Sequence, residues 1–113
     1  MKHILFLLIS LLNYCILVAQ PTYQIKHYSV NDGMSQGIVQ TIIQDKKGFL
    51  WFGTWNGLNK FDGYTFKNYK TSYKDAYILN TNRISQIAET KYGDIWCQVY
   101  DGRVYMFDNQ TEK

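Results

Sequence analysis

The sequence predicts an all-β protein that contains at least two similar antiparallel sheets. Short runs of β-branched and aromatic residues alternate with Gly and Asn/Asp turn signals, and the chain has 10 Tyr, 6 Phe and 3 Trp but only 1 Pro. Beyond the N-terminal segment, no stretch shows a sustained helical stripe of apolar residues. Trp51 and Trp96 stand 45 positions apart, as do Gly48 and Gly93. A fixed period of this length indicates an array of similar units.

Residues 1–19 are predicted to be a secretory signal peptide outside the fold. A short basic start precedes the almost wholly apolar run 4–18, which is short for a membrane span. Cleavage is expected after Ala19, because Pro21 would hinder cleavage at the next bond. Two alternatives remain open, an uncleaved membrane anchor and a lipoprotein modified at Cys15.

The composition argues against some kinds of partner and against a disulfide. Loss of Lys2 with the signal peptide lowers the formal net charge of +3 by one, and the remaining lysines are scattered. This balance is too weak for an electrostatic nucleic-acid interface. Removal of Cys15 leaves Cys97 without a partner in the chain. Because Cys97 follows Trp96 in an apolar run, we expect a buried and unreactive thiol.

Two long segments align with each other and define the repeat. IVQTIIQDKKGFLWFGTWNGLNKFD (38–62) matches RISQIAETKYGDIWCQVYDGRVYMFD (83–108), with one extra residue after Gly102. A shorter pair also matches, YQIKHYS from Tyr23 and YTFKNYK from Tyr64. The residues that define the unit are Asp45, Gly48, Trp51, Gly53 and Gly57 in the first copy and Gly93, Trp96 and Gly102 in the second.

Each unit is predicted to be a four-stranded meander. In the first unit, Asn56-Gly57 is a strong hairpin signal because both residues favour positive φ, and Asp62-Gly63 marks the next turn. The predicted strands are 38–44, 49–55, 58–61 and 64–70, with a further turn at 45–48.

The second predicted strand carries apolar residues on both faces. Phe49, Trp51 and Trp55 point to one side, while Leu50 and Phe52 point to the other. A strand covered on both sides needs neighbouring sheets on both sides, as the radially arranged blades of a β-propeller provide. We therefore expect about two blades of a larger ring; an open β-sandwich is the alternative architecture.

Three residues are assigned structural roles from this pattern. Trp51 and Trp96 are expected in the core of their blades. Gly53 is expected where a neighbouring aromatic residue approaches the backbone closely.

The predicted organisation has five parts. They are a signal peptide (1–19), an N-terminal strand and loop (20–37), blade one (38–70), a linker loop (71–82) and an incomplete blade two (83–113).

The first unit resembles the two-component regulator propeller repeat. The segment NDGMSQGIVQTIIQDKKGFLWFGTWNGLNKFDGYTFKNY (31–69) follows the family pattern almost position by position, with Met34 in place of the usual Leu. The second unit departs from the pattern, because Thr90 replaces the usual Asp and Cys97-Gln98-Val99 replaces the apolar-Gly-Thr triplet.

The resemblance implies a place in a larger protein. Such repeats build the periplasmic sensor region of Bacteroidetes hybrid two-component systems, many of which sense oligosaccharides, ahead of a membrane helix and a histidine kinase. The chain is thus expected to be a truncated N-terminal piece of such a sensor, without enzyme activity. Its expected partners are the missing blades or other copies of itself, an oligosaccharide, and a membrane only through an uncleaved signal or the absent downstream region. The alternatives are a secreted self-assembling interaction module and, more remotely, a piece of a propeller lyase or hydrolase.

The sequence offers no pattern for catalysis, metals or cofactors. His27 is the only histidine after the signal peptide, and Cys97 stands alone. The turn that begins at Asp45 lacks the alternating carboxylates of a calcium loop, so Asp45 is expected to cap its own turn.

One rim of the blades is the predicted ligand surface. Because turns of a meander alternate between two edges, the loops 31–37 and 71–82 share an edge with the second-to-third turns of both blades. Aromatic side chains at this rim could stack on a sugar ring, although Trp55 could equally pack against the adjacent blade. The candidate residues are Trp55, Asn56, Tyr100 and Asp101, with Tyr73 or Tyr77 as further aromatics.

Overall fold

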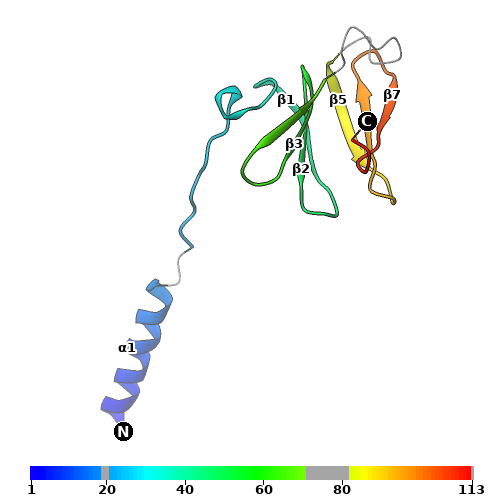
Figure 1. Cartoon of the computed structure of the whole chain (residues 1–113). Coiled ribbons are helices and arrows are strands. Elements are labelled where there is room, and N and C mark those ends of the chain that lie inside the picture. The colour runs from blue at the N-terminus through cyan, green and yellow to red at the C-terminus, as the bar shows by residue number, and fades with distance from the viewer. Residues whose placement is uncertain (19–20, 71–81, 113) are drawn as a thin grey trace.

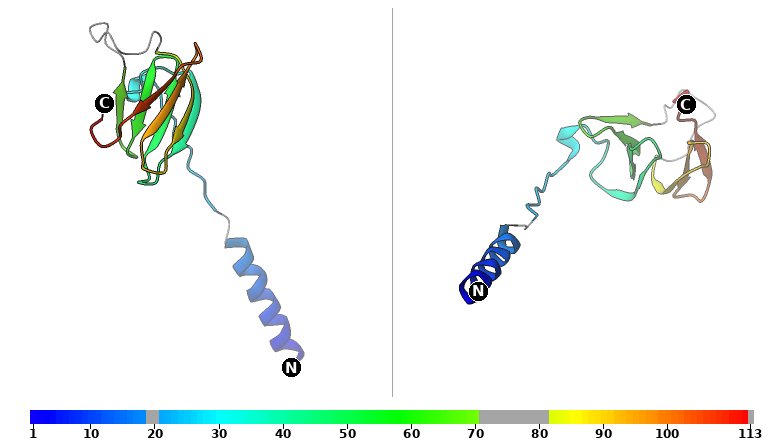
Figure 2. Two further views of the ribbon diagram at one scale, coloured as in Figure 1. Left: turned by 90° about the vertical axis from the view of Figure 1, so that its right-hand side faces the viewer. Right: turned by 90° about the horizontal axis from the view of Figure 1, so that it is seen from below.

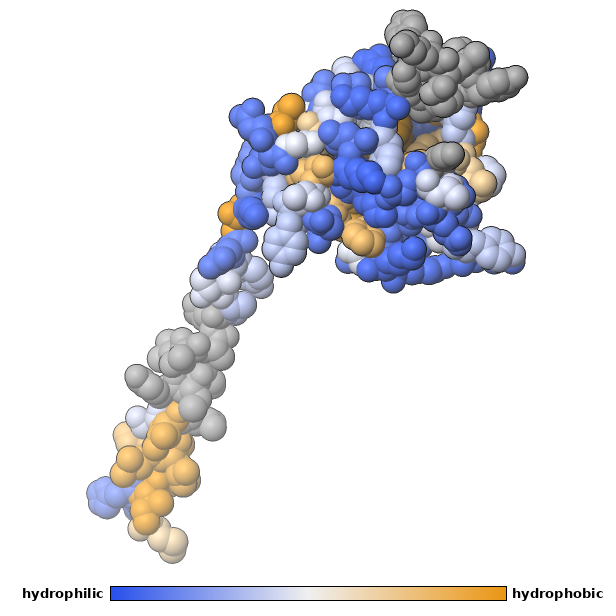
Figure 3. Space-filling view, viewed as in Figure 1, coloured by the Kyte–Doolittle hydropathy of each residue, from blue (hydrophilic) through white to orange (hydrophobic). Residues whose placement is uncertain are grey.

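A computed structural model of the chain describes residues 1–18, 21–70 and 82–112. Helix α1 (Lys2–Val18) stands apart from two antiparallel sheets (Figure 1). Apolar residues gather on α1, whereas hydrophilic residues cover most of the visible face of the sheets (Figure 3). Within the described residues, no helix is both long and apolar enough to span a membrane.

The first sheet, blade one, confirms the predicted four-stranded meander. Its strands are β1 (Val39–Gln44), β2 (Leu50–Thr54), β3 (Gly57–Phe61) and β4 (Phe66–Tyr69), hydrogen bonded in sequence order.

The second sheet, blade two, has three strands among the described residues. They are β5 (Ile84–Glu89), β6 (Ile95–Val99) and β7 (Val104–Phe107), again in sequence order.

The repeat extends to the pairing irregularities. β1 and β2 shift register between Val39 and Thr41, and β5 and β6 shift between Ile84 and Gln86. Because these positions correspond in the alignment, the first two strands of each blade pair in the same register.

The two blades pack face to face, with the core between them. Figure 2 shows the sheets overlapping in one view and side by side in the other. Trp51 is fully buried and lies against Phe107 of blade two, with ring centroids 5.5 Å apart. The buried core contains Trp51, Leu58, Ile84, Ile87, Ile95 and Cys97. These contacts, together with the sheet order, confirm the predicted all-β fold of two packed antiparallel sheets.

Asp45 caps its turn as predicted and also fixes the tryptophan. Its Oδ1 accepts hydrogen bonds from the backbone N–H groups of Lys47 and Phe49, at 2.9 Å each. Its Oδ2 accepts a 2.8 Å hydrogen bond from Trp51 Nε1. In blade two, the Thr90 hydroxyl accepts the two equivalent backbone hydrogen bonds.

The turns into the fourth-strand positions are also repeated. Asp62 Oδ1 accepts hydrogen bonds from the backbone N–H groups of Tyr64 and Thr65, and these bonds lower the pKa of Asp62. Asp108 makes the matching turn and accepts hydrogen bonds from Thr111, which also lower its pKa.

Gly53 is a close-approach position, although its neighbours are not aromatic as expected. A Cβ at Gly53 would lie 2.6 Å from Thr41 Cγ2 and 2.7 Å from Ile84 Cγ2. The first inner strand of blade two therefore rests directly on the backbone of β2.

The prediction that Trp96 is a core residue is wrong for this structure. Trp96 is 46% exposed, whereas Trp51 is 0% exposed. The two tryptophans occupy equivalent positions, and each points toward the side on which the next blade would lie. Blade two covers Trp51, but no described residue covers Trp96 to the same extent.

The strand expected within 20–37 does not form. Residues 21–29 have no strand partner among the described residues, and a short 3-10 helix follows at Val30–Asp32. An extended segment becomes a strand only when a neighbouring strand satisfies its backbone N–H and C=O groups.

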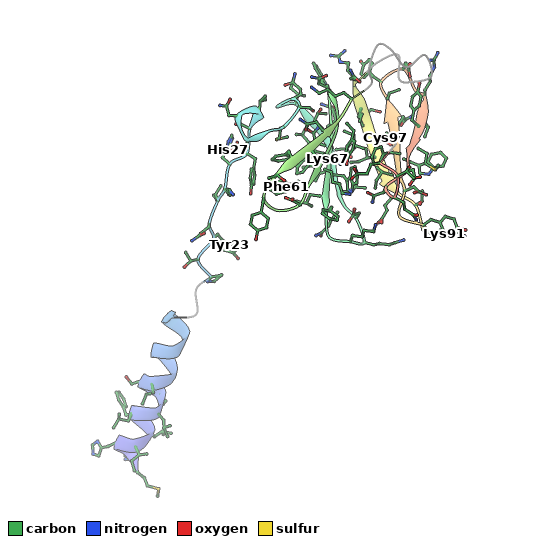
Figure 4. All side chains as sticks on the ribbon, viewed as in Figure 1. Tyr23, His27, Phe61, Lys67, Lys91 and Cys97 are labelled. Carbon is green, nitrogen blue, oxygen red and sulfur yellow. The ribbon has the colours of Figure 1, made fainter. Side chains whose placement is uncertain are left out.

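Cys97 is buried, as predicted, at 5% exposure. Burial raises the pKa of its thiol to about 12. Figure 4 shows Cys97 within blade two.

Candidate functional site

The candidate site lies on the rim that carries the second-to-third turns of both blades. Trp55 in the β2–β3 turn is 40% exposed, and Tyr100 in the β6–β7 turn is 74% exposed. The backbone of Tyr100 donates a hydrogen bond to Arg83 O at 3.0 Å, and Trp55 donates the equivalent one to Ile38 O at 3.3 Å. The repeat therefore places one aromatic side chain at the same rim position of each blade.

Glycines that follow the turns fix their geometry. Gly57 has φ +105°, and a Cβ there would lie 2.5 Å from Tyr69 O. Glu112 is the one non-glycine residue with positive φ in the described part of the chain. Asn56 therefore does not share the positive φ expected for it. Trp55 and Asn56 form the turn, and the left-handed residue that follows must be glycine.

A hydrogen bond joins the rim of blade one to blade two. Gly57 N donates to Asn82 O at 2.8 Å, so the β2–β3 turn is bonded to the residue two positions before β5. This contact holds Trp55 beside the start of blade two.

Arg83 lies between the two aromatic side chains. Its guanidinium carbon is 4.0 Å from the ring centroid of Trp55 and 5.4 Å from that of Tyr100. Cation–π contacts of this kind contribute about 0.5–1 kcal/mol each at exposed sites. Trp55, Arg83 and Tyr100 therefore form one cluster that bridges the blades, which we call the rim cluster.

Asn56 and Asp101 have structural contacts. Asn56 Nδ2 donates to Ser35 O at 3.3 Å. Asp101 accepts a 3.0 Å hydrogen bond from Arg103 N, and its Oδ2 lies 3.8 Å from Arg103 Nε. Both residues hold the turns and their adjoining loops in position beside the rim cluster.

The loop that approaches β1 is tied to the same rim. The fully buried Asn59 accepts a 2.8 Å hydrogen bond from Ser35 N and donates one to Ser35 Oγ. Ser35 Oγ also lies 3.1 Å from Thr54 Oγ1. The predicted sharing of one edge by the loop 31–37 and the β2–β3 turn is therefore confirmed.

The structure brings Trp55 and Tyr100 of the predicted site together through a residue that sequence reasoning missed. Arg83 stands where the first repeat has Ile38, so the replacement of an apolar residue by arginine was the available signal. Tyr73 and Tyr77 lie outside the described residues. Among the residues described, no group of three or more His, Cys, Asp or Glu side chains could hold a metal ion.

The rim cluster offers two kinds of recognition. Partly exposed aromatic faces can stack on the apolar face of a sugar ring. The arginine provides several N–H donors and a permanent positive charge. This combination suits a hydroxyl-rich or acidic ligand better than an apolar one.

Two sheets of one repeat that pack face to face have the arrangement of neighbouring blades in a β-propeller. Residues 33–56 match the family model described as two component regulator propeller. Over 70 residues, the chain is 43% identical to histidine kinase P4 of Formosa agariphila, an alignment that covers 62% of this chain and 5% of that protein.

A solved structure from another two component system also resembles this chain. The fold is similar to the extracellular domain of the putative hybrid two component system BT3049 from B. thetaiotaomicron, with a TM-score of 0.70 and 29% identity. The match covers 81% of this chain and 13% of that one. These comparisons confirm the resemblance to two-component regulator propeller repeats, and the chain spans a small part of both relatives.

Proposed function

We propose that the chain is part of the periplasmic sensor propeller of a hybrid two-component regulator and binds an oligosaccharide through the rim cluster. It has no catalytic role in this proposal; any kinase activity belongs to other domains. The similarity to the extracellular domain of a hybrid two component system supports the proposed place in a sensor propeller. The junction between the blades supports the binding role.

The observation that carries the binding proposal is the placement of Arg83 over Trp55 and toward Tyr100. The cluster draws one aromatic residue from each blade, so a ligand at this rim would contact both. The affinity for such a ligand would therefore depend on the relative position of the two blades, as a sensor requires.

Binding can be tested on the chain recovered from the periplasm of a Gram-negative host. Nuclear magnetic resonance titration with a panel of neutral and acidic oligosaccharides is expected to shift the Trp55 indole and Arg83 signals. Trp55→Ala is expected to weaken binding roughly tenfold, the loss of one central aromatic contact. Tyr64→Ala is the matched control, because Tyr64 is an 88% exposed aromatic beside the opposite turn, Asp62-Gly63.

The titration has two outcomes that would contradict the binding role. One is no binding by any oligosaccharide of the panel. The other is an equal loss of affinity in Trp55→Ala and Tyr64→Ala, which would place the ligand elsewhere.

The periplasmic location is tested separately. In this proposal α1 (Lys2–Val18) is the apolar region of the signal peptide, and cleavage follows Ala19. Leu8→Arg is expected to leave the protein in the cytoplasm, because a charge in this region impairs export, whereas Leu8→Ile is the control. Equal periplasmic recovery of the two variants would contradict export by this segment.

A further inference from the structure

Asn56-Gly57 in the β2–β3 turn is the one place in the sequence where glycine directly follows asparagine. An asparagine in this position can react with its own backbone. The nitrogen of the following residue attacks the side-chain carbonyl carbon, the bond from that carbon to the amide nitrogen breaks, and ammonia leaves with the proton of the backbone N–H. A five-membered succinimide ring remains, and water opens it to aspartate or isoaspartate. Glycine favours the attack because it has no side chain to obstruct it.

In the folded chain, both reacting groups donate hydrogen bonds. Gly57 N, the attacking atom, donates to Asn82 O at 2.8 Å. Asn56 Nδ2, the leaving nitrogen, donates to Ser35 O at 3.3 Å. Attack requires Gly57 N to lose its proton and to turn toward the Asn56 side chain. The bond to Asn82 O opposes both steps, because it stabilises the protonated nitrogen and holds it in place.

Gly57 is held by both blades. Its C=O accepts a 2.9 Å hydrogen bond from Thr54 Oγ1, within blade one. Its φ is +105°, and a Cβ at this position would lie 2.5 Å from Tyr69 O, also within blade one. Its N–H, in contrast, is bonded to the segment that leads into blade two. The group that must react is therefore the group whose position depends on blade two.

The hydrogen-bond acceptor is fixed by the packing of the blades. Asn82 lies two residues before Ile84, the first residue of β5. Ile84 rests on the backbone of β2, because a Cβ at Gly53 would lie 2.7 Å from Ile84 Cγ2. When β5 moves away from β2, Gly57 N loses its acceptor while the turn itself stays in blade one.

We infer that Asn56 is a site of covalent modification that the docking of blade two protects, and that it is converted to aspartate and isoaspartate when the junction between the blades opens. The inference is independent of any ligand. Aspartate places a carboxylate where Asn56 Nδ2 donates to Ser35 O, so a hydrogen bond is replaced by two facing oxygen atoms. Isoaspartate also adds a carbon atom to the main chain of the turn that carries Trp55. Both products disfavour the original rim geometry, so each opening that leads to reaction leaves a permanent change.

The reaction can be followed in the full chain recovered from the periplasm and incubated at pH 8, either folded or unfolded in guanidinium chloride. Trypsin cleavage after Lys47 and Lys60 releases residues 48–60, in which Asn56 and Asn59 are the two side-chain amides. Mass spectrometry detects replacement of the amide by a carboxyl group, and an isoaspartate methyltransferase detects isoaspartate. Asn59 is the internal control, because lysine follows it.

Asn56 is expected to react at least about tenfold more slowly in the folded chain than in the unfolded one, because reaction requires local opening. Asn59 is expected to react slowly in both. No conversion of Asn56 in the unfolded chain would overturn the assignment of the site. Equal rates in the folded and unfolded chains would overturn its protection.

Two variants distinguish opening of the junction from unfolding of the whole chain. Gly53→Ala is expected to speed the reaction of Asn56 in the folded chain at least about fivefold, because the added Cβ separates the blades. Tyr28→Ala is the control, because Tyr28 packs on the opposite face of blade one, with its ring centroid 4.9 Å from that of Phe61. Guanidinium unfolding measures the stability that each variant loses. Rates that rise in proportion to this loss in both variants would overturn the role of blade two.

Hydrogen exchange on the unaltered chain covers the case in which a variant fails to fold. The Gly57 N–H loses its proton both in exchange and in the reaction with Asn56. Folding is therefore expected to slow the two processes by the same factor, to within about tenfold. A Gly57 amide that exchanges as fast in the folded chain as in the unfolded one, or a larger disagreement between the two factors, would overturn the inference.

Discussion

Replacement of Asp45 tests how much its hydrogen bonds to the turn and to Trp51 contribute to the stability of blade one. The carboxylate is 4% exposed and accepts hydrogen bonds from Lys47 N, Phe49 N and Trp51 Nε1. Hydrogen bonds to a charged group contribute about 1.5–3 kcal/mol each. The two backbone donors lie in a turn that water can reach after the change. We therefore expect Asp45→Ala to lower the free energy of unfolding by about 3 kcal/mol, mainly through the buried indole N–H.

The matched control is the equivalent residue of blade two. Thr90→Ala removes two hydrogen bonds to a neutral hydroxyl, and the expected loss is about 1 kcal/mol. Urea unfolding followed by tryptophan fluorescence measures both changes. Equal losses in the two variants would refute the reasoning, because the difference rests on the Trp51 hydrogen bond and on the charge of Asp45.

Three further changes have defined outcomes. Gly53→Ala is expected to cost about 1–3 kcal/mol of stability in urea unfolding, because its Cβ would overlap Thr41 and Ile84; an unchanged midpoint would contradict the close approach. In a Cys15→Ser chain, Cys97 is expected to resist a thiol reagent at pH 8 until urea unfolds the protein, since burial raises its pKa to about 12. The pKa of Asp62 is lowered in the folded state, so its stabilisation is present above the ordinary value of 3.8 and is lost as the pH falls below it. Asp62→Ala should therefore flatten the acid side of the stability profile, and an unchanged profile would argue against this contribution.

The sequence predicted those features that depend on local chemistry. Asp45 followed by a glycine turn indicated a capped turn, and the residues are arranged in that way. The strands of blade one begin and end within two residues of their predicted limits, because glycines and aspartates mark every turn. The shared rim followed from the alternation of turns in a meander.

Features that depend on neighbouring blades could not be predicted in the same way. Trp51 and Trp96 are equivalent in sequence, but burial depends on what lies against each sheet face. The glycine at position 53 predicted a close approach to the backbone, but it did not show that the approaching residue is Ile84. The fourth-strand pattern from Tyr23 requires a partner strand before it can become a strand. Arg83 was missed because it follows the predicted linker and belongs to no recognised motif.

Two copies of one repeat pack face to face through the backbone of β2 and the first strand of blade two, and this packing underlies the whole fold. Nuclear Overhauser contacts from Gly53 test it most directly. We expect strong contacts from the Gly53 Hα atoms to the Ile84 methyl groups, and from the Trp51 ring to Phe107. Contacts from Gly53 and Trp51 to residues of blade one alone would contradict it.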